Sequence, residues 1–426
     1  MFQALRKIWQ KEFFKNVATL ISGTTLAQAF SVLIYIALSR IYTDEDFGIF
    51  GLYMNILNIT IIFSTAKYEL AILLPKSERE SVNLLGLSGL VSIVVSLLLL
   101  ITVLLFNEQI CGLLGSKEIS PWLYYIPLST LLVGLFQSFR NYSNREKRYK
   151  LIAGANIAQS LGNSLLKVII GLVIIGAAGL IFGVVFGQLV GFLIFFAVHI
   201  KVNRLKWNWL SLAEMKRLAK VYSLFPRYNM WQGLVNNLSG ALPVFIFSSY
   251  FSLAIAGIYT FGYMLIYRPV NLVAGAFYQV LYQRFSEKLN QGQSFLSELR
   301  LFLRQTILWL LIPFVIFGIF APDIFGFIFE KAEAGRYAQI MLPWIFMVSL
   351  TMPLSFIPDL YKQQRKAMLI DSVRLVGRLA AMAVGVAMDS VYLGLALYSG
   401  VSALMILYSL AWYIRLVKHN QAREDE

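Results

Sequence analysis

Charged side chains occur inside long apolar runs of this chain, where an ionised group needs a partner, a cavity or a ligand. The clearest set is Asp371, Arg374 and Arg378, which follow a spacing of i, i+3 and i+7 and therefore share one face of a helix. Asp371 can pair with Arg374, whereas Arg378 lies about one turn further along, with no acid near it in the sequence. Because a guanidinium binds phosphate through two parallel hydrogen bonds, the spacing indicates a site for an anionic ligand. Pairing of Arg378 with an acid on another helix is the alternative.

Further charged candidates for a site lie in two other apolar runs. Arg268 is followed by Pro269, which kinks a helix. Lys67 and Glu69 lie about 200° apart on a continuous helix and cannot pair with each other there. On such a helix Glu69 would extend a polar stripe that includes Thr65, so we expect it in a cavity wall or paired with a cation on another helix. Lys67 is the weaker functional candidate.

Uncharged polar residues form stripes in the first and the seventh apolar runs. Gln28 belongs to the first stripe and Asn236 to the second. The other members are Thr24, Ser31, Tyr35, Asn229, Gln232 and Ser239. Two interpretations stay open: the stripes form hydrogen bonds between helices, or they line one aqueous cavity.

Residue types for other chemistry are scarce. Cys111 is the only cysteine, so an internal disulfide and a cysteine metal cluster are excluded. His199 and His419 are the only histidines, and both lie at the ends of apolar runs. We expect no catalytic residue, no metal site and no cofactor, and hence no enzyme.

The elements that hold these side chains are membrane-spanning helices. Hydrophobic residues make up 58% of the chain and the mean hydropathy is +0.68, which is typical of a multi-pass membrane protein. Runs of about 20 apolar residues fit a hydrocarbon core of about 30 Å. The predicted twelve spans are residues 17–39, 48–74, 83–106, 121–139, 151–173, 179–199, 227–248, 255–282, 302–321, 338–360, 369–388 and 391–414.

Lys and Arg predict the orientation of these spans. With the N-terminus inside, the cytoplasmic segments hold 28 of these residues and the opposite loops hold 4. Both termini are therefore expected in the cytoplasm. The net charge of +15 is spread over seven segments, so it reports topology and does not indicate nucleic-acid binding.

The chain divides into two halves of six spans. The predicted segments are a cytoplasmic amphipathic N-terminus (1–16), an N-lobe (17–200), a cytoplasmic amphipathic linker (201–226), a C-lobe (227–414) and a cytoplasmic tail (415–426). An offset of 209 residues aligns Gly48 with Gly257, which indicates a repeat with its axis along the membrane normal. In the linker, Ser211 and Glu214 have the spacing of a capping box, and the helix that follows is expected to lie on the cytoplasmic leaflet.

Three stretches carry a family resemblance: RIYTDEDFGIFGLYMNI, YELAILLPKSERESVNLLGL and YSLFPRYNMW. With the basic N-terminus, they resemble bacterial polysaccharide flippases of the O-antigen and teichuronic-acid type. These belong to the multidrug/oligosaccharidyl-lipid/polysaccharide exporter superfamily. The likeness extends over essentially all of the chain and consists of hydrophobic patterns without an invariant motif.

The resemblance implies an all-α fold with two pseudo-symmetric six-helix lobes around a central cavity. It implies a flippase that moves an undecaprenyl-pyrophosphate-linked oligosaccharide, as in lipopolysaccharide synthesis, to the periplasmic leaflet of the bacterial inner membrane by alternating access. The substrate-binding candidates are then Arg268, Arg378, Arg374, Lys67, Gln28 and Asn236. Transport would be coupled to H⁺ or Na⁺ through Glu69 and Asp371. Expected partners are the lipid-linked oligosaccharide, membrane lipids, a glycan polymerase and a chain-length regulator.

Two other functions remain. A cation-coupled exporter of drugs or other small molecules would have a mainly acidic cavity, whereas the deep residues here are more often basic. A membrane-embedded glycan polymerase or ligase would need a large outer loop, and the longest one expected, about 321–338, is short.

Overall fold

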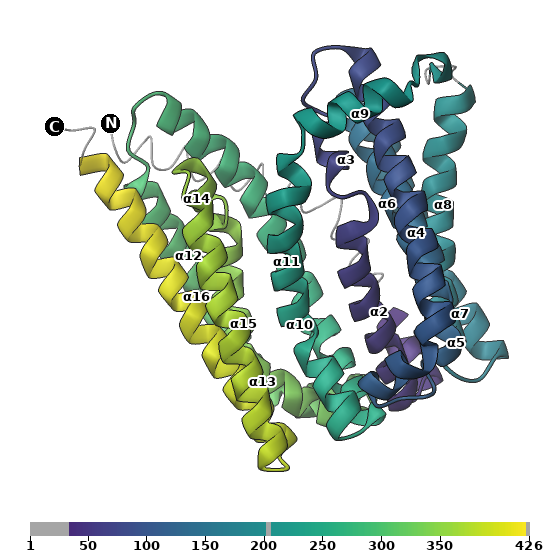
Figure 1. Cartoon of the computed structure of the whole chain (residues 1–426). Coiled ribbons are helices and arrows are strands. Elements are labelled where there is room, and N and C mark those ends of the chain that lie inside the picture. Colours follow the sequence, from purple (N-terminus) through teal and green to yellow (C-terminus); the bar gives the residue numbers. More distant parts are fainter. Residues whose placement is uncertain (1–33, 202–205, 423–426) are drawn as a thin grey trace. The chain divides into compact units, whose positions relative to one another are not determined.

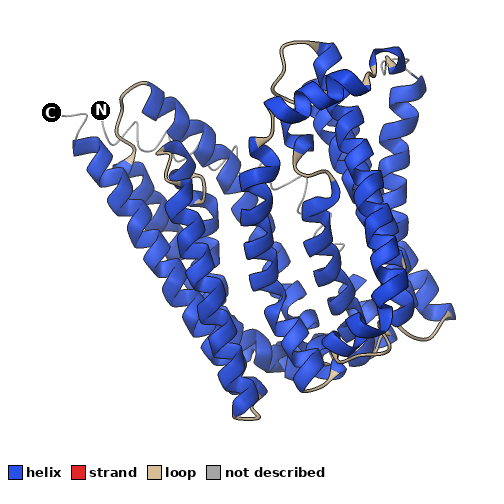
Figure 2. Ribbon diagram, in the orientation of Figure 1, coloured by secondary structure: helices blue, strands red, loops and turns tan. Residues whose placement is uncertain are grey.

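The protein is built from helices joined by short loops (Figures 1 and 2). The structure, a computed structural model, describes residues 34–201 and 206–422, and no β-strand occurs among them. Nine of the helices there are long and apolar enough to cross a membrane. Two further predicted spans are helical as well, and most of the first lies outside the described residues. The predicted all-α, multi-pass fold is confirmed.

Residues 34–41 are helical. Residues 42 and 43 form a short loop, and the first labelled helix begins after it. The first group is α2 (Asp44–Ser64), α3 (Tyr68–Ala71), α4 (Glu78–Leu114), α5 (Ser120–Leu123), α6 (Tyr125–Arg145), α7 (Tyr149–Val173) and α8 (Ala178–Lys201). The linker forms η1 (Trp207–Trp209), α9 (Leu212–Val221) and the π-helical turn η2 (Phe225–Asn229). The second group is α10 (Met230–Tyr250), α11 (Leu253–Asn290), α12 (Leu296–Phe329), α13 (Ala332–Thr351), η3 (Met352–Leu354), α14 (Ile357–Leu360), α15 (Gln364–Ala387) and α16 (Val391–Ala422).

The prediction that residues 48–74 form one continuous span is wrong. The helix α2 ends at Ser64, and the chain resumes helical geometry only in the four-residue α3. Between them Ala66 and Lys67 adopt left-handed backbone geometry, with φ of 48° and 64°. Hydrophobicity cannot detect such a break, because the residues on both sides of it are equally apolar. A capping box starts α2 instead, where Thr43 and Asp46 bond each other's backbone N–H.

The described residues pack into two compact units: the 37–257 unit, formed by residues 37–201 and 206–257, and the 258–426 unit, formed by residues 258–422 together with residues 34–36. The boundary at residue 257 places α10 and the start of α11 in the first unit. Packing units and symmetric halves are different divisions of a chain, so the predicted lobe boundaries stay a prediction.

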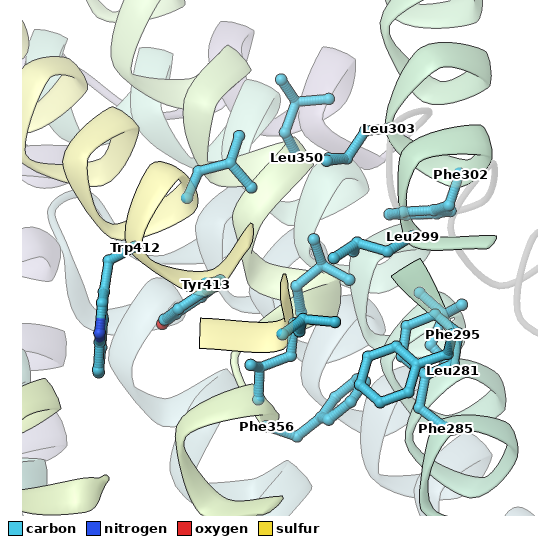
Figure 3. Close-up of a cluster of buried hydrophobic side chains, with 14 of the residues drawn as sticks. Leu281, Phe285, Phe295, Leu299, Phe302, Leu303, Leu350, Phe356, Trp412 and Tyr413 are labelled. Carbon is cyan, nitrogen blue, oxygen red and sulfur yellow. The ribbon is translucent and has the colours of Figure 1, made fainter. Parts of the chain in front are cut away.

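A core cluster of the 258–426 unit combines six aromatic side chains with nine aliphatic ones (Figure 3). Phe285 near the end of α11 and Phe295 before α12 stack with ring centroids 4.4 Å apart, and Phe356 meets Phe285 edge to face at 6.0 Å. Aromatic pairs in these geometries contribute about 0.5–1.5 kcal/mol beyond their buried area. This cluster joins the ends of α11, α12, α14 and α16.

The linker helix α9 packs part of its apolar face on protein, and its expected position on the cytoplasmic leaflet stays a prediction. Met215 and Leu218 are buried in a core cluster of the 37–257 unit that also contains Tyr68. The predicted capping box is absent: the Ser211 side chain makes no capping bond, and Glu214 pairs with Arg217. The helix is amphipathic as expected: Met215 and Leu218 are covered by protein, whereas Leu212 at its start is exposed.

Two glycines at repeat-related positions support the 209-residue offset. A Cβ on Gly257 would overlap the carbonyl oxygen of Asp44, and a Cβ on Gly48 would overlap that of Leu253. Leu253 follows Asp44 by 209 residues, as Gly257 follows Gly48. The contact is therefore reciprocal, as a local two-fold axis requires. Only glycine permits backbones to approach this closely.

Candidate functional site

Arg268 is the exposed cation within the long helix α11. Its guanidinium lies 5.6 Å from the ring centroid of Tyr35, a residue of the same unit that is only 6% exposed. Pro269 follows directly and donates no backbone hydrogen bond to the carbonyl of Leu265. The arrangement leaves a permanent positive charge available on a helix of membrane-spanning length.

Arg378 is in the opposite situation, because protein encloses it. It is 5% exposed, and its guanidinium lies 4.6 Å from the Tyr398 ring centroid and 5.0 Å from that of Trp344. Its Nε donates a hydrogen bond of 2.7 Å to the hydroxyl of Ser402. The charge is thus held by two aromatic faces and a hydroxyl, from α13 and α16.

The predicted pair of Asp371 and Arg374 is confirmed. Arg374 donates a hydrogen bond of 2.7 Å to Asp371, one turn away on α15, and both side chains are less than one fifth exposed. Each charge therefore has a partner at close range, and the pair as a whole is neutral.

Glu69 is buried, with 3% exposure, at the break between α2 and α3. Thr65 donates a hydrogen bond to its carboxylate, and the Glu69 backbone oxygen accepts one of 3.0 Å from Asn141. Arg140 on α6 interacts with it electrostatically. Arg140 is thus a cation on another helix whose field reaches Glu69, while the hydrogen bonds of Glu69 are made with Thr65 and Asn141. Lys67 itself occupies one of the two left-handed positions of the break.

The remaining candidates fall in different places. Asn236 is exposed on α10, and its neighbour Asn237 donates a hydrogen bond of 2.9 Å to the Asn58 carbonyl of α2. Gln28 lies outside the described residues. The structure brings Arg268, Asp371, Arg374 and Arg378 into the 258–426 unit, and Lys67, Glu69 and Asn236 into the 37–257 unit.

Sequence reasoning missed the aromatic residues around Arg378. Tyr259, Tyr263 and Tyr267 recur every four residues on α11, and neighbouring rings stack at 5.9 and 4.7 Å. Trp344 stacks on Tyr263 at 5.8 Å and meets Tyr398 edge to face at 5.4 Å. The i, i+4, i+8 spacing of the three tyrosines was a signal that could have found one face of this cluster.

Comparison with protein families assigns the chain. The family described as polysaccharide biosynthesis protein matches residues 37–329, more than half of the 426 residues. Curated protein sequences give no match.

Solved structures of transporters share the fold. The lipid II flippase MurJ in an inward closed conformation aligns with a TM-score of 0.71 at 13% identity, over 93% of this chain and 90% of that one. An inward-facing multidrug resistance MATE family transporter of the MOP superfamily aligns with a TM-score of 0.65 at 16% identity, over 91% and 95%. A MATE in complex with MaL6 gives 0.61 at 14% identity, over 96% and 97%.

These findings confirm the resemblance drawn from the sequence. The chain belongs to the polysaccharide biosynthesis protein family and has the fold of the MOP-superfamily transporters.

Proposed function

We propose that this protein is a flippase that moves an undecaprenyl-pyrophosphate-linked oligosaccharide repeat unit from the cytoplasmic to the periplasmic leaflet by alternating access. Its family and its fold support a transporter of polysaccharide synthesis and no enzyme. The observation that carries the proposal is Arg268, an exposed guanidinium within a helix of membrane-spanning length.

The chemistry of Arg268 fits a pyrophosphate. An arginine is charged at all physiological pH values and forms bidentate hydrogen bonds with phosphate oxygens. Tyr35 lies under its guanidinium at 5.6 Å and helps to hold the charge in place. A neutral or cationic substrate would leave this charge without a counterpart.

The other candidate site residues differ in how readily they can contact the substrate. Arg374 is partly exposed and can exchange Asp371 for a phosphate, whereas Arg378 can bind substrate only after the aromatic residues around it rearrange. Lys67, Gln28 and Asn236 are further candidate contacts. Glu69 and Asp371 are the acids we propose for coupling to H⁺ or Na⁺.

Deletion of the gene tests the function. We expect lipid-linked repeat units to accumulate on the cytoplasmic face and surface glycan to be lost, as measured by lipid extraction and mass spectrometry. Unaltered surface glycan without accumulation would contradict the proposal.

Complementation with Arg268→Ala tests the site. We expect at least a tenfold loss of flipping, with partial recovery in Arg268→Lys, because lysine keeps the charge and loses the planar fork. Arg336→Ala is the matched control, because Arg336 is also exposed but pairs with Glu333 at 3.2 Å near the start of α13. Full flipping by Arg268→Ala would remove the site assignment.

The alternative is a cation-coupled exporter of small molecules. It stays a candidate because one structural neighbour is described as a multidrug resistance transporter. Expression in a drug-sensitive host distinguishes the two functions: new resistance to cationic drugs supports the exporter, and its absence together with glycan rescue supports the flippase.

The setting of the proposed reaction follows from the sequence. We propose a location in the bacterial inner membrane with both termini cytoplasmic, and a role in O-antigen or lipopolysaccharide synthesis. A glycan polymerase and a chain-length regulator would then act on the product. Fusions of each terminus to a reporter that is active on only one side of the membrane test the orientation.

A further inference from the structure

The exposed face of α11 is polar along most of its length. Between residues 258 and 286 the exposed residues are Arg268, Pro269, Asn271, Gln279, Tyr282 and Gln283. None of them is Leu, Ile, Val, Ala, Met or Phe. Relative to Arg268, the side chains of Asn271, Gln279 and Tyr282 lie within about 80° on a helical wheel, so they form one stripe.

Other exposed helix faces of the same unit are apolar. On α12 the exposed residues between 307 and 320 are Ile307, Leu308, Trp309, Leu311, Ile312, Pro313, Val315, Ile316, Gly318, Ile319 and Phe320. On α15 the exposed residues between 370 and 387 are Val373, Val376, Leu379, Ala380, Ala383, Val384 and Ala387. These faces have the composition that lipid requires, whereas arginine and amide side chains are costly in hydrocarbon.

Two details point to a ligand along the stripe on α11. The hydroxyl of Tyr35, beside Arg268, is buried and has no hydrogen-bond partner within the part of the chain that the structure describes. Gly275 lies in the middle of the stripe, and a Cβ placed on it meets no atom within 4 Å. The stripe therefore has a notch at its centre and a buried polar group close to its charged end.

We propose that this stripe binds the saccharide of the transported lipid-linked oligosaccharide, with the pyrophosphate at Arg268 and sugar hydroxyls at Asn271, Gln279 and Tyr282. The inference rests on the proposed function. Amides both donate and accept hydrogen bonds, as sugar hydroxyls do. Arg268 is the only charged residue in the stripe, which sets the direction of the substrate. From Arg268 to Gln279 the helix rises about 16 Å, enough for several sugar units.

Cysteine accessibility tests whether the face meets water. Cys111 is the single native cysteine and is buried, so Cys111→Ser gives a clean background. In membrane vesicles we expect a membrane-impermeant thiol reagent to modify Asn271→Cys and Gln279→Cys at least tenfold faster than Ile312→Cys or Ile316→Cys on α12. Undecaprenyl-pyrophosphate-linked oligosaccharide extracted from the host should slow this modification, and undecaprenyl pyrophosphate alone should slow it less. Modification as slow as on α12, or equal protection by both lipids, would overturn the inference.

Flipping assays separate this inference from the proposed function. We expect Asn271→Ala with Gln279→Ala to lower flipping at least fivefold without lowering the melting temperature, and Ile312→Ala with Ile316→Ala to leave flipping unchanged. Full flipping by the Asn271/Gln279 double variant, with Arg268→Ala inactive, would overturn the saccharide assignment and leave the flippase standing. If deletion of the gene changed no glycan at all, the proposed function would fall, although the accessibility result would still show whether the face is wet.

Discussion

Arg378 and Arg268 are both arginines within the membrane-spanning part of one packing unit, but their surroundings differ. Arg378 is enclosed by Trp344, Tyr398 and Ser402. Arg268 is exposed and lies over the ring of Tyr35. Sequence spacing alone ranked them together, because both are cations in apolar runs.

The difference separates two uses of an intramembrane charge. An enclosed cation gains its stabilisation from aromatic faces and hydrogen bonds and holds helices in register. An exposed one keeps its hydrogen-bonding capacity for something outside the fold. The same distinction applies to Glu69, which is enclosed, and to Asn271 and Gln279, which are exposed.

Truncation of Arg378 should have the largest effect on stability. Arg378→Ala removes two cation–π contacts and a charged hydrogen bond, so we expect a loss of about 3 kcal/mol and a clearly lower melting temperature in detergent. Arg378→Met restores side-chain volume without the charge, so it should recover only part of the lost stability. Arg268→Ala is the matched variant and should melt like the wild type. A normal melting temperature for Arg378→Ala would show that its enclosure is not structural.

Glu69 should have the next largest effect. Glu69→Ala leaves the Thr65 hydroxyl unpaired in a buried site and removes the charge near Arg140, which should cost about 1–3 kcal/mol. Glu69→Gln keeps an acceptor for Thr65 and should cost less. A double-mutant cycle with Arg140→Gln measures the charge interaction directly. A coupling energy of zero would show that the electrostatic contact contributes nothing.

The fold was largely predictable from the sequence, because hydropathy acts over whole helices, whereas the orientation that Lys and Arg indicate stays a prediction. Side-chain spacing also predicted local pairs, such as Asp371 with Arg374 on one helix face. The repeat offset aligned Gly48 with Gly257. In the structure each of these glycines lies against the backbone carbonyl of a residue from the other stretch, where a Cβ would not fit.

The break after Ser64 could not be predicted, because left-handed geometry at Ala66 and Lys67 has no signature in residue type. These are not residues that favour positive φ, so tertiary contacts must hold them there. Arg378 differs from Arg268 through Trp344 and Tyr398, which come from other helices and are far away in the sequence. Side chains on other helices decide whether a charge is enclosed. The spacing of residues within one helix contains no information about those side chains.

Substitution of Lys67 by glycine should raise the stability of the protein, whereas the two preceding changes lower it. Its φ of 64° disfavours any side chain, so Lys67→Gly should stabilise the protein by about 1 kcal/mol if the ammonium makes no essential contact. Lys67→Val should destabilise it, because a β-branched residue tolerates this geometry least. Thermal melting of both variants checks the prediction. A lower melting temperature for Lys67→Gly would show that the Lys67 side chain contributes more than its backbone strain costs, and would place it with the enclosed charges.

The exposed ion pairs of Arg217 on α9, with Glu214 on the same helix and with Glu80 on α4, should have the smallest effect. The hydrogen bond from Arg217 lowers the pKa of the Glu214 carboxyl. Because the folded pKa lies below the unfolded one, the pair's contribution is present above the unfolded pKa and is lost as the pH falls through the folded value. Solvent and salt screen it, so Arg217→Gln and Glu214→Gln should melt like the wild type at physiological ionic strength. A small deficit should emerge at low salt and neutral pH and disappear on acidification. A deficit that persists at low pH would show that Arg217 stabilises the protein through packing rather than through its charge.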